Sequence, residues 1–314
     1  MQRRAFFLAA LITFAALITS AHAQSNCPPQ DRKELILTAL DKDGNVLDKL
    51  RREHLSLKLG NAPATILNVA FHADQPLDIA VMIDSSLSQE RVLPLSKAAA
   101  QTFIKSFATA GRDRVATVSF STKANNNPEW SSDFAAAVAS IDQIKLDIPP
   151  GYVGGGAMIS VGPPPRNRVL PGSTSLWDVV RTAIQTLFAG NAENRRRVIL
   201  LFTDGNDTAS SGKLNGAIEE AVQDDVAVFS VGLDSDFGLN EGALKKLSEQ
   251  TGGVTSRAKK KEQLETALAE IAKRLRGSYV ISYCGGLNTK GKLQVEVLDP
   301  EIRKAKPVLA YKKQ

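Results

Sequence analysis

Five oxygen-bearing side chains in this 314-residue sequence fall into three short segments whose spacing could hold a metal ion. Asp84, Ser86 and Ser88 alternate in one segment, so their three oxygens can turn toward one point. Thr174 follows a Gly-Ser pair, and Asp204 lies in a Thr-Asp-Gly sequence. Two carboxylates and three hydroxyls without His or Cys form a hard oxygen donor set. Such a set suits Mg²⁺, or Mn²⁺ and Ca²⁺, rather than Zn²⁺.

Apolar segments just before the two aspartates must position them. Residues 77–83 and 198–202 are short, nearly continuous apolar runs, which indicate strands buried on both faces of a parallel sheet. Asp84 and Asp204 then follow the carboxyl ends of two such strands, where open α/β sheets bind their ligands. Thr174 lies in a loop that opens a predicted helix at 176–188. The three segments are therefore expected at one edge of the sheet.

The rest of the chain predicts the fold around this edge. Strands that alternate with helices indicate an α/β fold with a doubly wound, mainly parallel sheet. Further strands are expected at 114–120 and 226–231, and further helices at 90–109, 134–144, 214–222, 241–250 and after Lys261. Residues 147–172 are rich in Pro and Gly and are expected to form an exposed loop.

Both ends of the chain have a different, β-rich pattern. Residues 34–47 predict a hairpin around a turn at Asp41 to Asn45, and further strands are expected at 54–59, 279–284, 293–298 and 308–311. We therefore predict an N-terminal β segment at 24–75, an α/β domain at 76–275, and a C-terminal β segment at 276–314. The two β segments are expected to pair into one accessory sheet.

The three oxygen-bearing segments resemble the metal-ion-dependent adhesion site of von Willebrand factor type A domains, found in integrins and many bacterial proteins. That site has D-x-S-x-S after the first strand, a Thr in a later loop, and an Asp in a T-D-G or S-D-G loop. Asp84, Ser86, Ser88, Thr174 and Asp204 fill its five places in order. The resemblance covers about residues 76–275 and implies a Rossmann-like fold. It also implies that the three hydroxyls ligate the ion directly, while the two aspartates act mainly through water.

The flanking segments resemble a bacterial secreted subgroup of these proteins. Its N-terminal strand-turn-strand is matched by residues 37–47, and its C-terminal R-x-x-Y-x-x-x-Y pattern by Arg276, Tyr279 and Tyr283. Two departures occur near the ligands, where Leu87-Ser88-Gln89 replaces the usual Gly-Ser-Met and Ser173 replaces a Gly. Neither departure removes a ligand, although Leu87 could narrow the approach to the ion.

Binding rather than catalysis is the function that these residues favour. The resemblance implies an adhesion-type module that captures an exposed Asp or Glu of a partner protein through the ion. A metal-independent scaffold of the same fold, binding through the 147–172 loop, is the alternative. In that case the five residues would serve only as hydrogen-bonding groups of their loops. We expect no enzyme, because neither His nor an unassigned acid in these motifs offers a general base.

The first residues of the chain predict export. Arg3 and Arg4 precede an apolar run and an Ala-His-Ala sequence at 21–23, which is typical of a cleaved signal peptide over residues 1–23. We therefore expect a periplasmic or secreted protein, exported by the general or the twin-arginine route. The two cysteines, Cys27 and Cys284, could pair in an oxidising compartment, and unpaired thiols or a bridge to another chain are the alternatives.

The net charge argues against a nucleic-acid partner, and the hydropathy pattern predicts no membrane span after the leader. The net charge falls from +6 to +4 when the leader takes two arginines and no acid with it, which is too little to indicate nucleic-acid binding. The basic triplets 195–197 and 259–261 are predicted to be solvated surface. Outside the leader, no apolar run approaches the roughly 18 residues that a membrane span requires.

Overall fold

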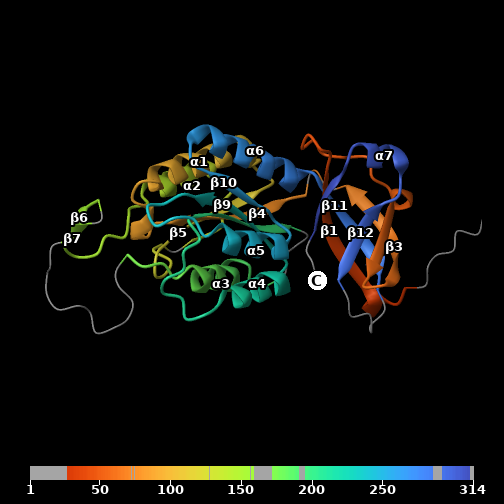
Figure 1. The fold of residues 1–314 in the computed structure, drawn as a ribbon, viewed down its shortest axis with the longest axis horizontal. Coiled ribbons are helices and arrows are strands. Elements are labelled where there is room, and N and C mark those ends of the chain that lie inside the picture. Colours follow the sequence, from red (N-terminus) through yellow and green to blue (C-terminus); the bar gives the residue numbers. More distant parts are fainter. Residues whose placement is uncertain are drawn as a thin grey trace, which may run out of the picture.

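The computed structural model of the chain describes residues 27–311 apart from 72, 74, 127, 156, 159–171, 191–194 and 286–291. It has two main parts, a parallel sheet covered by helices and an antiparallel sheet, which lie end to end (Figure 1). The predicted signal peptide at 1–23 lies outside the described residues. Within the described ranges, no helix is both long and apolar enough to cross a membrane.

The central sheet confirms the predicted parallel arrangement. In the described part of the chain it has five parallel strands in the order β10-β9-β8-β4-β5. The inner strands β4, β8 and β9 are buried along their whole length, as their continuous apolar runs predict. The strands are β4 (Leu77–Asp84), β5 (Arg114–Phe120), β8 (Arg196–Thr203), β9 (Val226–Leu233) and β10 (Thr255–Ala258).

Helices cover both faces of this sheet (Figure 1). One face packs against α1 (Leu93–Phe107), α2 (Phe134–Asp142) and α6 (Lys261–Arg276). The other face packs against α3 (Leu176–Leu187), α4 (Leu214–Gln223) and α5 (Glu241–Thr251). Each helix presents an apolar stripe to the sheet, which places one hydrophobic core on each side of it.

The two ends of the chain pair in the antiparallel sheet, as the sequence predicts. Strand β1 aligns with β11 from Arg32 opposite Cys284 to Thr38 opposite Ser278. In the described residues the sheet order is β12-β2-β3-β11-β1-β13. These strands are β1 (Arg32–Leu40), β2 (Leu55–Leu59), β3 (Ala62–Phe71), β11 (Ser278–Cys284), β12 (Leu293–Val297) and β13 (Val308–Tyr311). A disulfide joins Cys27 to Cys284 across a sequence separation of 257 residues and confirms the internal pair.

Two local features lie at the chain ends. The hairpin predicted at 34–47 is present in a short form: the turn at Asp41 to Asn45 leads to an antiparallel bridge between Leu40 and Val46, while the rest of β1 pairs with β11 and β13. Between the strands predicted at 293–298 and 308–311 the chain forms a short helix, α7 (Pro300–Lys304). Asp299 accepts a hydrogen bond from the backbone N–H of Ile302, and a proline at the first helical position completes this helix start.

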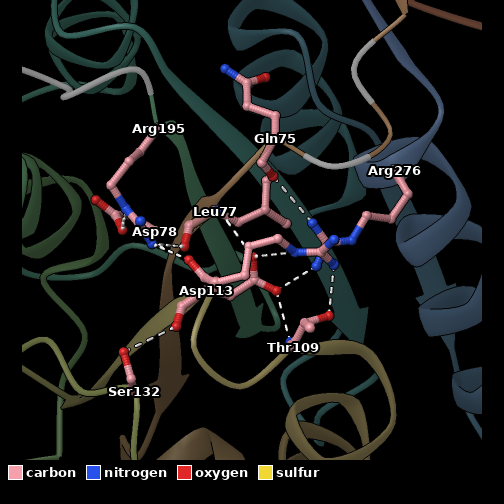
Figure 2. Close-up of polar contacts among 9 residues, drawn as sticks. Gln75, Leu77, Asp78, Thr109, Asp113, Ser132, Arg195 and Arg276 are labelled. Carbon is pink, nitrogen blue, oxygen red and sulfur yellow. Dashed lines mark hydrogen bonds and ion pairs between the residues drawn. The ribbon is translucent and has the colours of Figure 1, made fainter.

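The amino-terminal edge of the parallel sheet carries a buried cluster of charges (Figure 2). Asp78, the second residue of β4, accepts two hydrogen bonds from Arg114 at 2.9 and 2.6 Å. It accepts a third from Arg195 at 2.6 Å. Because the Asp78 side chain is only 7% exposed, these pairs lie in a poorly solvated region where losing one partner is costly.

Asp113 connects the same edge to the antiparallel sheet (Figure 2). Its carboxylate accepts from the backbone N–H groups of Leu77 and Thr109 at 3.1 and 2.8 Å, and it forms an ion pair with Arg276. Arg276 also donates to the carbonyl of Gln75 at 3.2 Å. Both chain segments that cross between the two sheets are therefore held at Asp113. The carboxyl edge of the parallel sheet faces away from the antiparallel sheet (Figure 1).

The prediction that residues 195–197 form solvated surface is wrong. Arg196 and Arg197 are 3% and 8% exposed, because they lie in the central strand β8. Arg197 donates to the carbonyls of Gly190 and Asp224 beside α3 and α4. Arg196 donates to the carbonyl of Leu275 at 3.0 Å and to the hydroxyl of Ser278, so it stabilises the end of α6. Burial lowers the pKa of its guanidinium to about 10. The triplet at 259–261 is exposed, as predicted.

Candidate metal centre

The loop after β4 brings three of the predicted ligands together. The carboxylate of Asp84 accepts the backbone N–H of Ser86 at 3.0 Å and the hydroxyl of Thr203 at 2.6 Å. The hydroxyl oxygens of Ser86 and Ser88 lie 3.2 Å apart. A single 3-10 turn at Leu87–Gln89 follows Ser86, so the chain bends back and both hydroxyls stay at the strand end. Asp84 and Ser86 are buried, and Ser88 is partly exposed.

Asp204 lies at the carboxyl end of the neighbouring strand β8. One of its carboxylate oxygens accepts the backbone N–H of Asn206 at 3.0 Å. Its other oxygen, Oδ2, is buried and has no hydrogen-bond partner within the described ranges. A fully buried carboxylate oxygen without a partner is unusual, because desolvation of a charged group is costly unless the charge is compensated.

The loop before α3 bridges these two strand ends. The backbone N–H of Thr174 donates to the hydroxyl of Thr208 at 2.9 Å, and its carbonyl accepts the backbone N–H of Thr208 at 2.9 Å. Two residues earlier, the carbonyl of Gly172 accepts the N–H of Leu87 at 3.0 Å. Gly172 has φ +83° and a Cβ there would lie 3.0 Å from the Cβ of Leu87, so both conformation and space require glycine. The five predicted residues thus lie on three loops joined by hydrogen bonds.

The electrostatics of this edge favour a bound cation. Burial, and secondly the nearby charge of Asp204, raise the pKa of Asp84 to about 7, against the hydrogen bonds from Thr203 and Ser86. Two buried carboxylates, one with an unpartnered oxygen, therefore lie beside serine hydroxyls, and no cationic side chain of the described residues is bonded to either acid. Across the described residues, no group of three or more His, Cys, Asp or Glu side chains is placed to hold a metal ion. The donor set that remains is hydroxyls plus two acids, and it fits a hard divalent ion.

Two further residues of this edge were not predicted. The hydroxyl of Thr203 donates to Asp84 and accepts the N–H of Gly205 at 3.1 Å, so it links the two strand ends. Gln89 is fully buried, and its Nε2 donates to the hydroxyl of Ser88 at 3.0 Å. Its Oε1 is buried and lacks a partner within the described chain. The only sequence signal for Gln89 was its place next to a ligand, where the related motif has Met.

Glu90 and Arg91, which follow the loop of Asp84 to Gln89, each contact a segment outside the candidate metal centre. Glu90 accepts a hydrogen bond from the hydroxyl of Tyr152, which lies in a two-strand hairpin of β6 (Tyr152–Gly154) and β7 (Ala157–Met158). Arg91 pairs with Asp236 of the loop after β9 at 2.6 Å. The predicted exposed loop at 147–172 therefore begins with a hairpin, whereas its residues 159–171 lie outside the described residues.

Comparison with known proteins identifies the type of fold. The family model of the von Willebrand factor type A domain matches residues 166–273, which contain Thr174 and Asp204. A structure described as von Willebrand factor type A from Catenulispora acidiphila aligns with TM-score 0.50 and 12% identity, over 92% of this chain and 73% of that one. No curated protein matches the chain.

Proximal thread matrix protein 1 from the mussel byssus has the same fold. It aligns with TM-score 0.50 and 17% identity over 68% of this chain, and this chain spans about half, 48%, of its length. A further structure of the mussel protein, described with a zinc-occupied MIDAS motif, aligns at 16% identity over 68% of this chain and 48% of that one, with TM-score 0.50. At these identities the likeness shows the von Willebrand factor type A fold of the parallel-sheet part.

Proposed function

We propose that this protein binds a partner protein through a divalent cation held at the carboxyl edge of the parallel sheet. The observation that carries the proposal is the unpartnered buried oxygen of Asp204 beside the buried carboxylate of Asp84. Von Willebrand factor type A domains commonly mediate protein–protein interactions, which supports binding as the outcome.

Hydroxyl and carboxylate side chains would hold the ion in different ways. The hydroxyls of Ser86, Ser88 and Thr174 would ligate it, while Asp84 and Asp204 would act mainly through bound water. When bound, Mg²⁺ (or Mn²⁺ or Ca²⁺) supplies an electrophilic centre that accepts a carboxylate in place of a water. Because no described carboxylate of this chain supplies that last ligand, the natural replacement is an exposed Asp or Glu of the partner.

The remaining features of the proposal concern context. The disulfide between Cys27 and Cys284 supports an oxidising compartment, and with the predicted leader it supports a periplasmic or secreted location. The hydroxyl of Tyr279 contacts the backbone of Leu47, so the two flanking patterns of the secreted bacterial subgroup meet in one sheet. We propose that the protein is not an enzyme, that it does not bind nucleic acid, and that no segment after the predicted leader spans a membrane.

Calorimetry with Mg²⁺, Mn²⁺, Ca²⁺ and Zn²⁺ on residues 24–314 tests the metal site. We expect binding of a hard ion that is lost in Asp84→Ala and weakened in Thr174→Ala, because that hydroxyl would be a direct ligand. Thr182→Ala, an exposed threonine of α3, is the matched control and should bind normally. Zn²⁺ is included because of the zinc-occupied motif of the mussel protein. Equal metal binding by the Asp84→Ala variant and the native chain would rule out this site.

Partner capture separates the proposal from the metal-independent scaffold. Protein retained from the exporting cell's envelope should require the divalent ion, be released by EDTA, and be lost in Asp204→Ala while the fold survives. Shortening the 147–172 loop should alter partner choice more than metal affinity. Full retention in EDTA would favour the scaffold, with the 147–172 loop as the surface to test next.

A further inference from the structure

An apolar groove opens between the first turns of α1 and residues 142–148. It has a volume of about 590 Å³. We call it the α1 groove, and its apolar lining consists of Leu93, Pro94, Ala98, Ile144, Leu146 and Ile148. Ile148 is 55% exposed, which is unusual for so large an apolar side chain next to further apolar groups. The groove therefore offers an apolar surface that the described part of this chain does not cover.

The α1 groove adjoins the candidate metal centre. Helix α1 begins at Leu93, five residues after Ser88. On the opposite wall, the backbone N–H of Asp147 donates to the carbonyl of Ser85 at 2.8 Å. The carboxylate of Asp147 also accepts the hydroxyl of Ser121 at 2.6 Å. Both walls of the groove are thus fastened to the loops that carry the predicted ligands.

Side chains of α1 hold the far wall in place. Lys97 donates from Nζ to the carbonyls of Asp142 and Ile144, each at 2.9 Å. Gln101 donates to the carboxylate of Asp142 at 2.6 Å. These bonds fix the segment against the helix, so the groove exists before any partner arrives. Preformed apolar surface binds with less ordering cost than a surface that must first assemble.

The rim of the groove carries more positive than negative charge. Lys97 and Lys145 line it together with one acid, Asp142, whose carboxylate accepts the hydrogen bond from Gln101. A cation at the neighbouring metal centre would add further positive charge. The chemistry that complements this edge is an acidic segment that also carries an apolar side chain.

We propose that the α1 groove takes an apolar side chain of the same partner segment whose carboxylate reaches the metal, an inference that rests on the proposed function. The groove follows α1 over residues 93–101, about 12 Å at 1.5 Å per residue. An extended peptide advances about 3.3 Å per residue. The groove itself therefore spans about four residues of an extended segment, and the apolar residue lies at a fixed spacing from the Asp or Glu, on one side of it only.

A leucine scan in synthetic peptides tests this spacing. The probes are 13-residue Gly/Ser peptides with one central Asp and one Leu placed in turn at each of the six positions on either side. Binding to residues 24–314 is measured by NMR titration in Mg²⁺ and in EDTA. We expect one or two adjacent Leu positions, on one side of the Asp only, to tighten Mg²⁺-dependent binding about tenfold, less than full burial of a Leu side chain allows.

Matched variants test whether the tighter binding of the Leu peptides depends on the α1 groove. Ala98→Trp fills the groove from an exposed position of α1, and Lys105→Trp adds the same side chain to an exposed position of that helix outside the groove. Ile148→Ser removes the exposed apolar wall and serves as the second test if Ala98→Trp melts at a lower temperature. The Leu-dependent gain should disappear in Ala98→Trp and Ile148→Ser and remain in Lys105→Trp, with Mg²⁺ affinity unchanged in all three.

The outcomes separate the groove from the metal centre. Mg²⁺-dependent binding of the Asp peptides without any preferred Leu position, or a preference that survives Ala98→Trp, overturns the groove and leaves the proposed function standing. A Leu preference that persists in EDTA overturns the link between groove and metal. Absence of Mg²⁺-dependent binding by every peptide overturns the proposed function and the groove together.

Discussion

Replacing Asp204 by Asn should stabilise the metal-free protein and remove its response to Mg²⁺. The change keeps the side-chain shape and the oxygen that accepts the N–H of Asn206, but it removes the charge next to Asp84. In the native chain the pKa of Asp84 is raised from 3.8 to about 7, first by burial and then by Asp204. A shift of that size corresponds to about 4 kcal/mol of lost stability once both folded and unfolded forms are ionised.

The sign follows from linkage. Because the folded pKa of Asp84 lies above the unfolded value, the metal-free protein loses stability as pH rises from about 4 through about 7, and the full cost is present above that range. Asp204 is the second cause and burial remains in the variant, so Asp204→Asn recovers a part, about 1–2 kcal/mol at pH 8. The gain should vanish near pH 4, where Asp84 is protonated in the folded protein.

Thermal and urea unfolding of residues 24–314 in EDTA and in Mg²⁺ provide the assay. In EDTA at pH 8 the variant should melt about 2–6 °C above the native chain. Saturating Mg²⁺ should stabilise the native chain by about 2.7 kcal/mol at 100 times its dissociation constant, and the variant hardly at all. The order of stability would then reverse between the two conditions. A variant that is less stable in EDTA, or equally stabilised by Mg²⁺, would refute the reasoning.

Three further changes have distinct expected effects. Replacing Cys27 and Cys284 by Ser should lower the free energy of unfolding by up to about 5 kcal/mol, as the 257-residue separation implies, with no change in Mg²⁺ affinity by calorimetry. Gln89→Met should leave the metal-free melting temperature unchanged or higher, because it removes a buried unpartnered carbonyl. The same variant should bind Mg²⁺ roughly tenfold more weakly, because Ser88 loses its hydrogen-bond partner. A lower metal-free melting temperature with unchanged Mg²⁺ affinity would contradict a role of Gln89 in positioning Ser88. Asp113→Asn should cost about 3 kcal/mol in urea unfolding, since Arg276 loses its carboxylate, and an unchanged midpoint would show that the ion pair contributes nothing.

Local patterns in the sequence were sufficient for the parallel sheet and for the edge that carries the candidate site. A strand that is buried on both faces needs apolar residues on both faces. The continuous apolar runs before Asp84 and Asp204 therefore predicted that β4 and β8 are buried. Strand ends in a parallel sheet meet at one edge, so the aspartates could be placed together without knowing any contact. The hairpin at 34–47 closes only at Leu40 and Val46, because a turn signal does not show which strand will pair with the rest of β1. That position is taken by β11, more than 200 residues away in the chain.

The sequence by itself determined which side chains could hold an ion, the order in which they occur, and the edge of the sheet where they lie. Only the tertiary structure decided which of their atoms lack partners, because that depends on packing between distant segments. The unpartnered oxygens of Asp204 and Gln89 are of this kind. The burial of Arg196 is another, since a charged triplet is typical of surface unless another sheet covers it and carbonyls accept its hydrogen bonds. Periodicity reports the burial of apolar groups, whereas the burial of polar groups follows from partners that only the folded chain supplies.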